Sequence, residues 1–579
     1  MQFARFVEFL AQLEGTTKRN AMVEILSNLF KEAGSEEIDK IIYLCQERLV
    51  PAYVNLEFGI GEQLAAEALS KATGRPKDEI RRLYKEKGDY GIAAEILLPA
   101  QGKGLSVKEV YDRLHTIATA GGEGAVTQKT TILANLLTDL SAQEARYVLR
   151  IPLGQLRLGI GDPTVMDGLS FARVGDKSLR PVIEHAYNLC SDLGYVARVF
   201  WEQGITGLEG IHVQVGKPVR MALAERASGA AEIIERMGTA AIEPKLDGFR
   251  CQVHKDGDDI RIFSRNLEET TNMLPDIRDA VRVQVKAESA VFEGEALAYN
   301  PDSGEFLPFQ VTVQRKRKYD IDRMREELPL RLVCFDILYL NGRDVMSLPY
   351  TERRKLLEET IGEGEGLQVN EVLMTNDVAQ VEAFFAEKVS LGLEGIVAKR
   401  LDSPYQAGSR NYNWIKLKRS YQGELSDSVD CVIVGYWRGR GQRARFGIGS
   451  LLTAVYDKPN DRFVTISKVA TGLSDEEWVR MRELLDKISL PQKPARLEAA
   501  IEPDVWVEPH YVVEIRADEI TRSPMHTAGR GDGTIGYALR FPRIINFIRE
   551  DKSPEDATTE QEVLDMFARQ GRKGTEAGD

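Results

Sequence analysis

One lysine stands where it could act as a nucleophile towards phosphorus. Residues 243–250 read EPKLDGFR, so Lys245 ends a predicted strand and is followed closely by an aspartate and a glycine. A free ε-amine has a pKa of about 10.4 and attacks phosphorus only where a cation, a metal or burial favours its neutral form. Asp247 could orient the amine, and Gly248 lets the backbone approach a nucleotide. An ordinary surface turn could carry the same short pattern.

Five further segments carry side chains suited to a nucleotide. They read FSRN at 263–266, FEGEAL at 292–297, CFDILYLNG at 334–342, LEGIVAK at 393–399 and WIKLK at 414–418. A carboxylate in an apolar strand, such as Glu295, is costly unless it is paired or binds a metal or a sugar hydroxyl. Alternation puts Lys416 and Lys418 on one strand face, where both could reach one triphosphate. Taken singly, these residues could equally be edge charges and core aromatics.

In their order and separations these segments resemble the nucleotidyltransferase motifs of ATP-dependent DNA ligases. The resemblance implies that Lys245 is the catalytic residue, that Phe335 stacks on adenine, and that ATP and Mg²⁺ are the cofactors. The metal ligands that it implies are Glu295 and Glu394. The nucleotide-binding residues that it implies are Glu243, Arg250, Arg265, Glu295, Phe335, Arg410, Lys416 and Lys418. Whether ADP or NAD can replace ATP stays open.

A basic stretch near the C-terminus resembles the last ligase motif. It reads LRFPR at 539–543 and REDK at 549–552. In the family this motif lies on a separate domain and helps to expel pyrophosphate, which implies that role for Arg540, Arg543 and Lys552. The motif favours a DNA ligase over an RNA-capping guanylyltransferase. An RNA ligase or capping enzyme, and a non-catalytic DNA scaffold, are the alternatives.

The chain of 579 residues is too long for one core, so we expect three domains. Residues 1–210 show helical spacing, for example at 107–118 and 129–137, and predict an all-α region. Residues 211–420 alternate strands and helices, with a hairpin turning at 255–258, and predict an α+β nucleotidyltransferase domain. The resemblance identifies the first region as a DNA-binding domain of the archaeal and eukaryotic replicative type.

Residues 421–579 predict a small β-barrel, which the resemblance makes an OB-fold. The expected strands are 429–436, 451–456, 463–469 and 505–515. A helix should follow Ser553, opened by a capping box of Thr559 and Glu562, and residues 571–579 should be disordered.

Two similar turns in the helical region could hold DNA phosphates. Each is a Gly-x-Gly step before a predicted helix, where free backbone amides attract an anion without reading sequence. The candidate DNA-binding residues are Gly59, Gly61, Arg150, Arg157, Gly159 and Gly161. Ordinary helix-to-helix turns could have the same composition.

The overall charge does not signal nucleic-acid binding. Lys and Arg total 76 against 89 Asp and Glu, a net charge of -13, so any DNA contact depends on local clusters. Residues 315–318 and the arginines at 438, 440, 443 and 445 are basic runs that could follow a DNA backbone or be solvated loops. The five cysteines lack zinc or disulfide spacing, unlike the zinc module of NAD-dependent ligases.

The sequence therefore predicts a DNA ligase used in replication, repair and recombination. Its expected substrate partner is nicked double-stranded DNA, and the chain is expected to be a monomer. Neither a signal peptide nor a membrane-length apolar run is evident, which predicts a cytoplasmic, nucleoid-associated protein. Archaeal relatives often bind the replication sliding clamp through paired aromatics before the helix at 107. Residues 99–104 read PAQGKG, so clamp binding there is in doubt.

Overall fold

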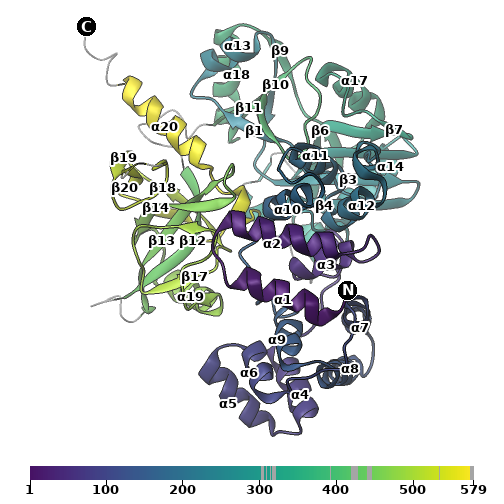
Figure 1. Ribbon diagram of the computed structural model, residues 1–579. Coiled ribbons are helices and arrows are strands. Elements are labelled where there is room, and N and C mark those ends of the chain that lie inside the picture. Colours follow the sequence, from purple (N-terminus) through teal and green to yellow (C-terminus); the bar gives the residue numbers. More distant parts are fainter. Residues whose placement is uncertain are drawn as a thin grey trace. The chain divides into compact units, whose positions relative to one another are not determined.

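The chain forms two compact units (Figure 1). The computed structural model describes residues 1–300, 306–307, 309–312, 315, 321–391, 393–418, 428–439, 446–531, 533 and 535–573, with the backbone alone at 309, 310, 322 and 569–573. The first unit comprises Met1–Tyr187 and Ser191–Ile211, and the second comprises Asn188–Cys190 and His212–Asp579. The second unit thus contains both the region predicted as a nucleotidyltransferase domain and the one predicted as a barrel. The division into three domains stays a prediction.

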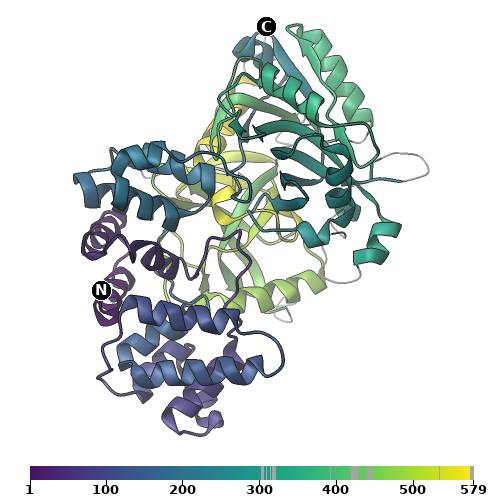
Figure 2. The same ribbon diagram turned by 90° about the vertical axis from the view of Figure 1, so that its right-hand side faces the viewer.

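The first unit is built from helices, as the sequence predicts (purple to blue in Figures 1 and 2). In chain order they are α1 (Phe3–Glu14), α2 (Arg19–Glu32), α3 (Ile38–Cys45), α4 (Glu62–Thr73), α5 (Lys77–Lys87), α6 (Tyr90–Leu97), α7 (Val107–Thr119), α8 (Ala125–Asp139), α9 (Ala142–Arg150), α10 (Asp162–Val174), α11 (Arg180–Cys190) and α12 (Leu193–Glu209). Capping boxes begin α7 at Ser106 and α9 at Ser141. Helix α4 packs against α8, and α10 packs against α2. The helices expected at 107–118 and 129–137 are confirmed as α7 and part of α8.

The second unit begins with two sheets. The five-stranded sheet has the order β1-β11-β10-β2-β9. The six-stranded sheet has the order β4-β3-β5-β6-β7, with its sixth strand, β8, beside β6. Their strands are β1 (Leu223–Arg226), β2 (Ala240–Lys245), β3 (Phe249–Asp256), β4 (Asp259–Ser264), β5 (Ser289–Ala298), β6 (Leu330–Leu340), β7 (Arg343–Asp344), β8 (Leu367–Val369), β9 (Leu373–Thr375), β10 (Gly395–Arg400) and β11 (Arg410–Lys418). Helices α13 (Ala230–Met237), α14 (Pro275–Gln284), α15 (Phe309–Thr312), α16 (Ile321–Glu327), α17 (Tyr350–Thr360) and α18 (Val378–Ser390) accompany them. This composition confirms the predicted α+β region.

The chain passes from one sheet to the other directly after Lys245. Strand β2 ends at Lys245 in the five-stranded sheet, and β3 begins at Phe249 in the six-stranded sheet. Between them, a Cβ on Gly248 would lie 2.3 Å from the carbonyl oxygen of Ala296 on β5. Only glycine fits so close to this carbonyl oxygen, so Gly248 allows the two sheets to join tightly. The predicted approach of its backbone to a nucleotide stays a prediction. The hairpin expected here is β3–β4, with a shorter turn than predicted, since Asp256 already pairs with Asp259.

The C-terminal part of this unit is rich in strands, as expected of the predicted barrel. Its eight-stranded sheet contains β12 (Ser428–Arg438), β13 (Ile448–Asp457), β14 (Arg462–Val469), β15 (Ser489–Leu490), β16 (Leu497–Glu498), β17 (Val505–Val507), β18 (Val512–Arg516) and β21 (Arg543–Asn546). A separate hairpin pairs β19 (Glu519–Ser523) with β20 (Gly536–Arg540), and the helices are α19 (Asp475–Lys487) and α20 (Glu560–Lys573). The capping box predicted at Thr559 is present, because its hydroxyl donates to Glu562 and accepts from the Glu562 amide.

Two expectations about this part were wrong in detail, and one helix was not expected. The run 505–515 is two strands, because Pro509 interrupts it and has no amide proton for a ladder. Helix α19, begun by a capping box at Ser474, was not anticipated. The predicted tail begins too early, since α20 continues to Lys573. Residues 574–579, the arginines at 440, 443 and 445, and residues 316–318 lie outside the described residues.

Arg315, the described member of the first basic run, is not placed to follow DNA. Its guanidinium is buried, pairs with Asp276 at 3.0 Å and donates to the backbone oxygens of Met324 and Leu328. Its charge therefore stabilises the fold. In the described part of the chain, no helix is long and apolar enough to cross a membrane.

A buried ion pair predicts a large loss of stability on substitution. Arg353 of α17 donates to both carboxylate oxygens of Asp336 on β6 at 2.8 and 3.1 Å, and both side chains are at most 1% exposed. Arg353→Met would leave the carboxylate buried without a cation, at a cost of about 3–5 kcal/mol. We expect a drop in the thermal midpoint on the order of 10 °C by calorimetry.

The matched control is Arg323→Met. Arg323 forms an i,i+4 pair with Glu327 and is 75% exposed, so its substitution should change the free energy of unfolding by less than about 0.5 kcal/mol. Equal midpoints for the two variants would contradict a stabilising role for the Arg353–Asp336 pair.

Candidate active site

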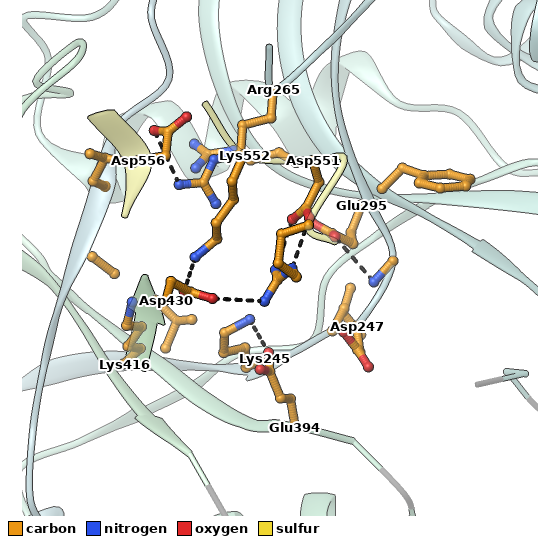
Figure 3. Close-up of a pocket in the computed structure, with 18 of the residues that line it drawn as sticks. Lys245, Asp247, Arg265, Glu295, Glu394, Lys416, Asp430, Asp551, Lys552 and Asp556 are labelled. Carbon is orange, nitrogen blue, oxygen red and sulfur yellow. Dashed lines mark hydrogen bonds and ion pairs between the residues drawn. The ribbon is translucent and has the colours of Figure 1, made fainter. Parts of the chain in front are cut away.

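The amine of Lys245 is ion-paired with Glu394 (Figure 3). The same carboxylate accepts from Lys418, so it lies between two ammonium groups. Strand pairing produces this arrangement, because Gly395 at the start of β10 is opposite Lys245 on one side and Lys418 on the other. Burial would raise the pKa of Glu394, but the two lysines outweigh it and hold the pKa well below the ordinary value.

A cavity of about 750 Å³ opens above this group. Its wall contains all the predicted nucleotide-binding and metal-binding residues: Glu243, Lys245, Arg250, Arg265, Glu295, Phe335, Glu394, Arg410, Lys416 and Lys418. Lys552 of the predicted C-terminal motif also lines it. This volume is within the range of small-molecule sites. The segments that the sequence grouped by resemblance therefore converge on one cavity.

Two further carboxylates lie close to Lys245. Burial raises the pKa of Glu295 on β5 to about 7, although Lys245 and Arg250 lower it, and the Glu295 carboxylate accepts a hydrogen bond from the Gly248 amide. Burial, followed by repulsion from Glu394, raises the pKa of Asp247. Three carboxylates, of Asp247, Glu295 and Glu394, therefore lie around the lysine.

Carboxylates are also the side chains that can bind a hard cation. Hard oxygen ligands suit Mg²⁺, which usually takes one or two carboxylates and completes its shell with water and phosphate oxygens. Within the described residues, no group of three or more ligands is arranged to hold a metal by itself. Glu295 and Glu394 offer carboxylate oxygens of the kind that Mg²⁺ takes, and their role as its ligands stays a prediction.

The far end of the cavity suits a flat base. Phe335 on β6 lines it, and the ring of Trp414 meets Phe335 edge-on with centroids 6.0 Å apart. Glu243 also lines the cavity, is 2% exposed and accepts hydrogen bonds from Tyr350 and Asn370. An aromatic face beside a fixed acceptor can stack a base and read its edge.

Arg250, predicted as a nucleotide-binding residue, has its charge paired within the protein. It donates to Glu293 at 2.8 Å and to the backbone oxygen of Ala222 at 2.6 Å, and its guanidinium lies 5.4 Å from the ring centres of both Phe335 and Trp414. It lines the cavity wall with its charge already paired, which suits a residue that supports the aromatic side chains of the base site.

Several cations of the cavity are paired with acids from the C-terminal part. Glu562 of α20 pairs with Arg410 and with Arg226, whose Nε lies 3.2 Å away, and Arg265 lies 3.6 Å from Asp556. Burial and then Arg226, Arg410 and Lys418 lower the pKa of Lys416 well below its ordinary value.

Lys552 is held by Asp430 of β12 (Figure 3), and Arg549 is 3.3 Å from the same carboxylate. The other two residues of the predicted C-terminal motif lie away from the cavity wall. Arg540 pairs with Glu519 at 2.7 Å, Arg543 lies 3.3 Å from Asp518, and both arginines are about half exposed. The structure brings only the Lys552 end of the motif to the cavity.

The two Gly-x-Gly turns of the first unit share a backbone geometry. Gly59 and Gly159 have φ of 63° and 67°, and Gly61 and Gly161 are the N-cap residues of α4 and α10, without side-chain caps. The acids that follow are engaged by tyrosines: Tyr84 donates to Glu62 at 3.0 Å, and Tyr187 donates to Asp162 at 2.6 Å. Because the N-cap residue of each helix is a glycine, no N-cap side chain accepts a hydrogen bond from the backbone amides of the first turn.

The two arginines predicted beside these turns differ. Arg150 is 5% exposed and pairs with Asp89 at 2.6 Å and with Glu14 at 3.1 Å, so its charge is used inside the unit. Arg157 is half-buried with a φ of 51°. Lys129, which the sequence did not single out, has its amine 3.4 Å from the backbone oxygen of Phe58 and closes over Gly59. DNA contact at these residues stays a prediction.

Sequence reasoning missed the acids that hold the cavity cations. Asp430 stands in the apolar run SVDCVIVGYW, and the argument used for Glu295 would have found it. Glu562 was recognised only as a helix cap, and its second role depends on tertiary placement. Lys399 ends the quoted segment LEGIVAK, and the argument used for Glu295 would have found it as well, whereas Tyr350, which also contacts Glu243, carries no local signal.

Comparison with known proteins identifies the family. Residues 2–170 match "DNA ligase N terminus", residues 221–418 match "ATP dependent DNA ligase domain", and residues 444–552 match "ATP dependent DNA ligase C terminal region". A probable DNA ligase of Dictyoglomus turgidum is 57% identical over 576 residues, covering 100% of this chain and 99% of the relative. DNA ligase 2 of Thermofilum pendens is 42% identical, covering 98% of each chain, and the DNA ligase of Aeropyrum pernix is 43% identical, covering 99% of each.

The chain belongs to the ATP-dependent DNA ligases, in the archaeal type of that family. It is an enzyme that uses ATP and seals nicks in DNA. The predicted family, the multidomain fold class and the ligase activity are confirmed.

The raised pKa of Glu295 predicts a pH-dependent stability. Because the folded-state pKa of about 7 lies above the ordinary value of 4.5, the folded chain holds a proton between these pH values that the unfolded chain lacks. The contribution of Glu295 to the free energy of unfolding therefore falls as the pH rises through this interval. Glu295→Gln keeps an acceptor for Gly248 and removes the charge.

We expect Glu295→Gln to unfold at a temperature a few degrees higher than the parent at pH 8, without metal or nucleotide, and the gap to close as the pH is lowered to 5. Calorimetry across this range measures it. The exposed Glu382→Gln on α18 is the control and should show no pH-dependent gap. If the unfolding temperatures of Glu295→Gln and the parent differed by the same amount at every pH, burial would not determine the protonation of Glu295.

Proposed function

We propose that Lys245 is the residue through which this ligase carries AMP. The observation that supports this most directly is its position: a lysine at the end of β2, sharing Glu394 with Lys418, at the floor of a cavity lined by further cations. Phosphoryl transfer depends on positioning and charge neutralisation more than on a proton relay, and this cavity offers both.

The reaction has three balanced steps. The amine of Lys245 leaves its pair with Glu394, loses a proton and attacks the α-phosphorus of ATP, so that a P–N bond forms and pyrophosphate leaves. The 5′-phosphate at a nick then attacks the same phosphorus, which breaks the P–N bond and gives an adenylated DNA end. Finally the 3′-hydroxyl attacks the 5′-phosphorus and AMP leaves.

The remaining predicted residues divide by the part of ATP that they face. Phe335 would stack on the adenine and Glu243 would read its edge. Phosphate oxygens would be met by Arg265, Arg410, Lys416, Lys418 and Lys552. Glu295 and Glu394 would hold Mg²⁺, which when bound neutralises phosphate charge. Arg540 and Arg543 would act only after the C-terminal part moves, since they lie off the cavity wall.

The finer assignments of partner and location belong to the same proposal. The helical region 1–210 would hold nicked duplex DNA through the backbone amides at Gly61 and Gly161. Regions 211–420 and 421–579 would act as separate domains that reorient between nucleotide loading and sealing. The protein would act as a cytoplasmic, nucleoid-associated monomer in replication, repair and recombination, and the loop at 99–104 offers no aromatic pair to a sliding clamp.

Covalent labelling tests the role of Lys245. The purified protein, incubated with α-labelled ATP and magnesium, should retain label after denaturation, and peptide mapping should place that label on Lys245. Adding nicked DNA to the native labelled protein should move the label to DNA and release it as the strand is sealed. Lys245→Ala should lose all label and still bind nicked DNA.

Two other outcomes would favour the alternatives. Label that forms but does not leave with nicked DNA would indicate an RNA-directed nucleotidyltransferase. Label retained in Lys245→Ala would place the nucleophile elsewhere. Repeating the labelling with ADP and NAD settles the range of donors.

Glu562 predicts a variant with stronger nucleotide binding. Its carboxylate occupies Arg226 and Arg410, which face the proposed phosphate site, so a nucleotide must displace it. Glu562→Gln removes the charge and keeps an oxygen for the Thr559 cap, so α20 should still form. We expect a severalfold lower KM for ATP in Lys245 labelling.

The control for this variant is Glu560→Gln in the same helix. Glu560 accepts from the Gly529 amide and is not paired with Arg226 or Arg410, so the same loss of charge should leave the KM for ATP unchanged. An equal KM in both variants and the parent would show that the phosphates do not use these arginines.

A further inference from the structure

A buried lysine lies beneath the base end of the cavity and has no part in the steps above. Lys399 of β10 is 1% exposed. Its amine donates to the backbone oxygen of Phe335 at 2.8 Å and pairs with Glu243 Oε2 at 3.0 Å. One cation is therefore bonded both to the residue proposed to stack on the base and to the residue proposed to read its edge.

Aromatic rings enclose the same amine. The ring centres of Trp414, Phe335 and Tyr350 lie 4.5, 4.9 and 5.1 Å from the Lys399 Nζ, within the range of cation–π attraction. Burying a lysine is costly even when it is paired, and an apolar side chain of similar length could fill this space. The amine therefore contributes a hydrogen bond and an ion pair that an apolar side chain could not make.

The amine fixes what Glu243 can offer to a ligand. Glu243 also accepts from the Tyr350 hydroxyl and from Asn370 Nδ2 at 3.2 Å, and Arg354 lies 3.8 Å away. All these neighbours are donors or cations, so the carboxylate is kept as an acceptor in one orientation. An acceptor at the base edge favours an exocyclic amino group, as on adenine, and is repelled by a carbonyl oxygen at the same place, as on guanine.

We propose that Lys399 is a positioning residue for base selection. Its amine joins the Glu243 carboxylate to the backbone oxygen of Phe335, and so fixes the position of this hydrogen-bond acceptor relative to the stacking ring. The site then prefers ATP to GTP. This inference rests on the proposed function, since it assumes that the base lies between these two residues. Tyr350 assists through its hydroxyl, which holds the other oxygen of the carboxylate.

The test is the ratio of kcat/KM for ATP to that for GTP in covalent labelling. Lys399→Met keeps the side-chain length and removes both bonds, and we expect the ratio to fall by about tenfold or more, through a higher KM for ATP and a relative gain for GTP. Tyr350→Phe keeps the ring and removes one hydrogen bond, and it should lower the ratio in the same direction by less.

Lys388→Met is the matched control. Lys388 of α18 is also a buried lysine, 4% exposed, with its amine 4.6 Å from the ring centre of Phe384, and it pairs with Glu371 and Glu387 away from the cavity wall. The same substitution there should leave the ratio unchanged. A general loss of stability lowers labelling by ATP and GTP alike and so does not move the ratio.

The possible failures are separable. Absence of label from ATP in the parent protein would overturn the proposed function itself. Label that prefers ATP in the parent and keeps the same ratio in both Lys399→Met and Tyr350→Phe would overturn this inference alone. If Lys399→Met does not fold, an unchanged ratio in Tyr350→Phe is sufficient to reject it.

Discussion

The site depends on one carboxylate held between two ammonium groups. Glu394 pairs with Lys245 and Lys418, and this is possible only because β10 lies between β2 and β11 with Gly395 opposite both lysines. A one-residue slip on either side would turn a lysine to the opposite face of the sheet. The apolar core beneath β2, β10 and β11, with α13 and α18 packed on it, therefore fixes the electrostatics above.

The cavity also combines two kinds of chemistry. One end of the cavity is aromatic and holds its charges in closed pairs, such as Arg250 with Glu293 and Lys399 with Glu243. The other end gathers cations that are paired with acids of the C-terminal part, among them Glu562 and Asp430. The first set of pairs lies within the two sheets and holds the base site in shape, whereas the second set would have to exchange an acid for a phosphate.

Much of this could be predicted from the sequence, for identifiable reasons. Alternation along 414–418 was enough to place Lys416 and Lys418 on one strand face, and the order and separations of the other segments, which resemble those of a known family, were enough to group them at one site. The break at Pro509 and the helix begun by Ser474 are local signals that were present and not used. Arg150 and Arg315 could not be placed, because whether an arginine pairs internally depends on acids distant in sequence, here Asp89 and Asp276.

One carboxylate oxygen has two local tasks. Glu562 Oε2 accepts from the Thr559 amide that begins α20 and also pairs with Arg410. An anion that takes Arg410 leaves this oxygen to the Thr559 amide alone, so the strength of the cap on α20 and the occupancy of the cavity are thermodynamically linked. The first turn of the last helix thus reports on a site that its own backbone does not line.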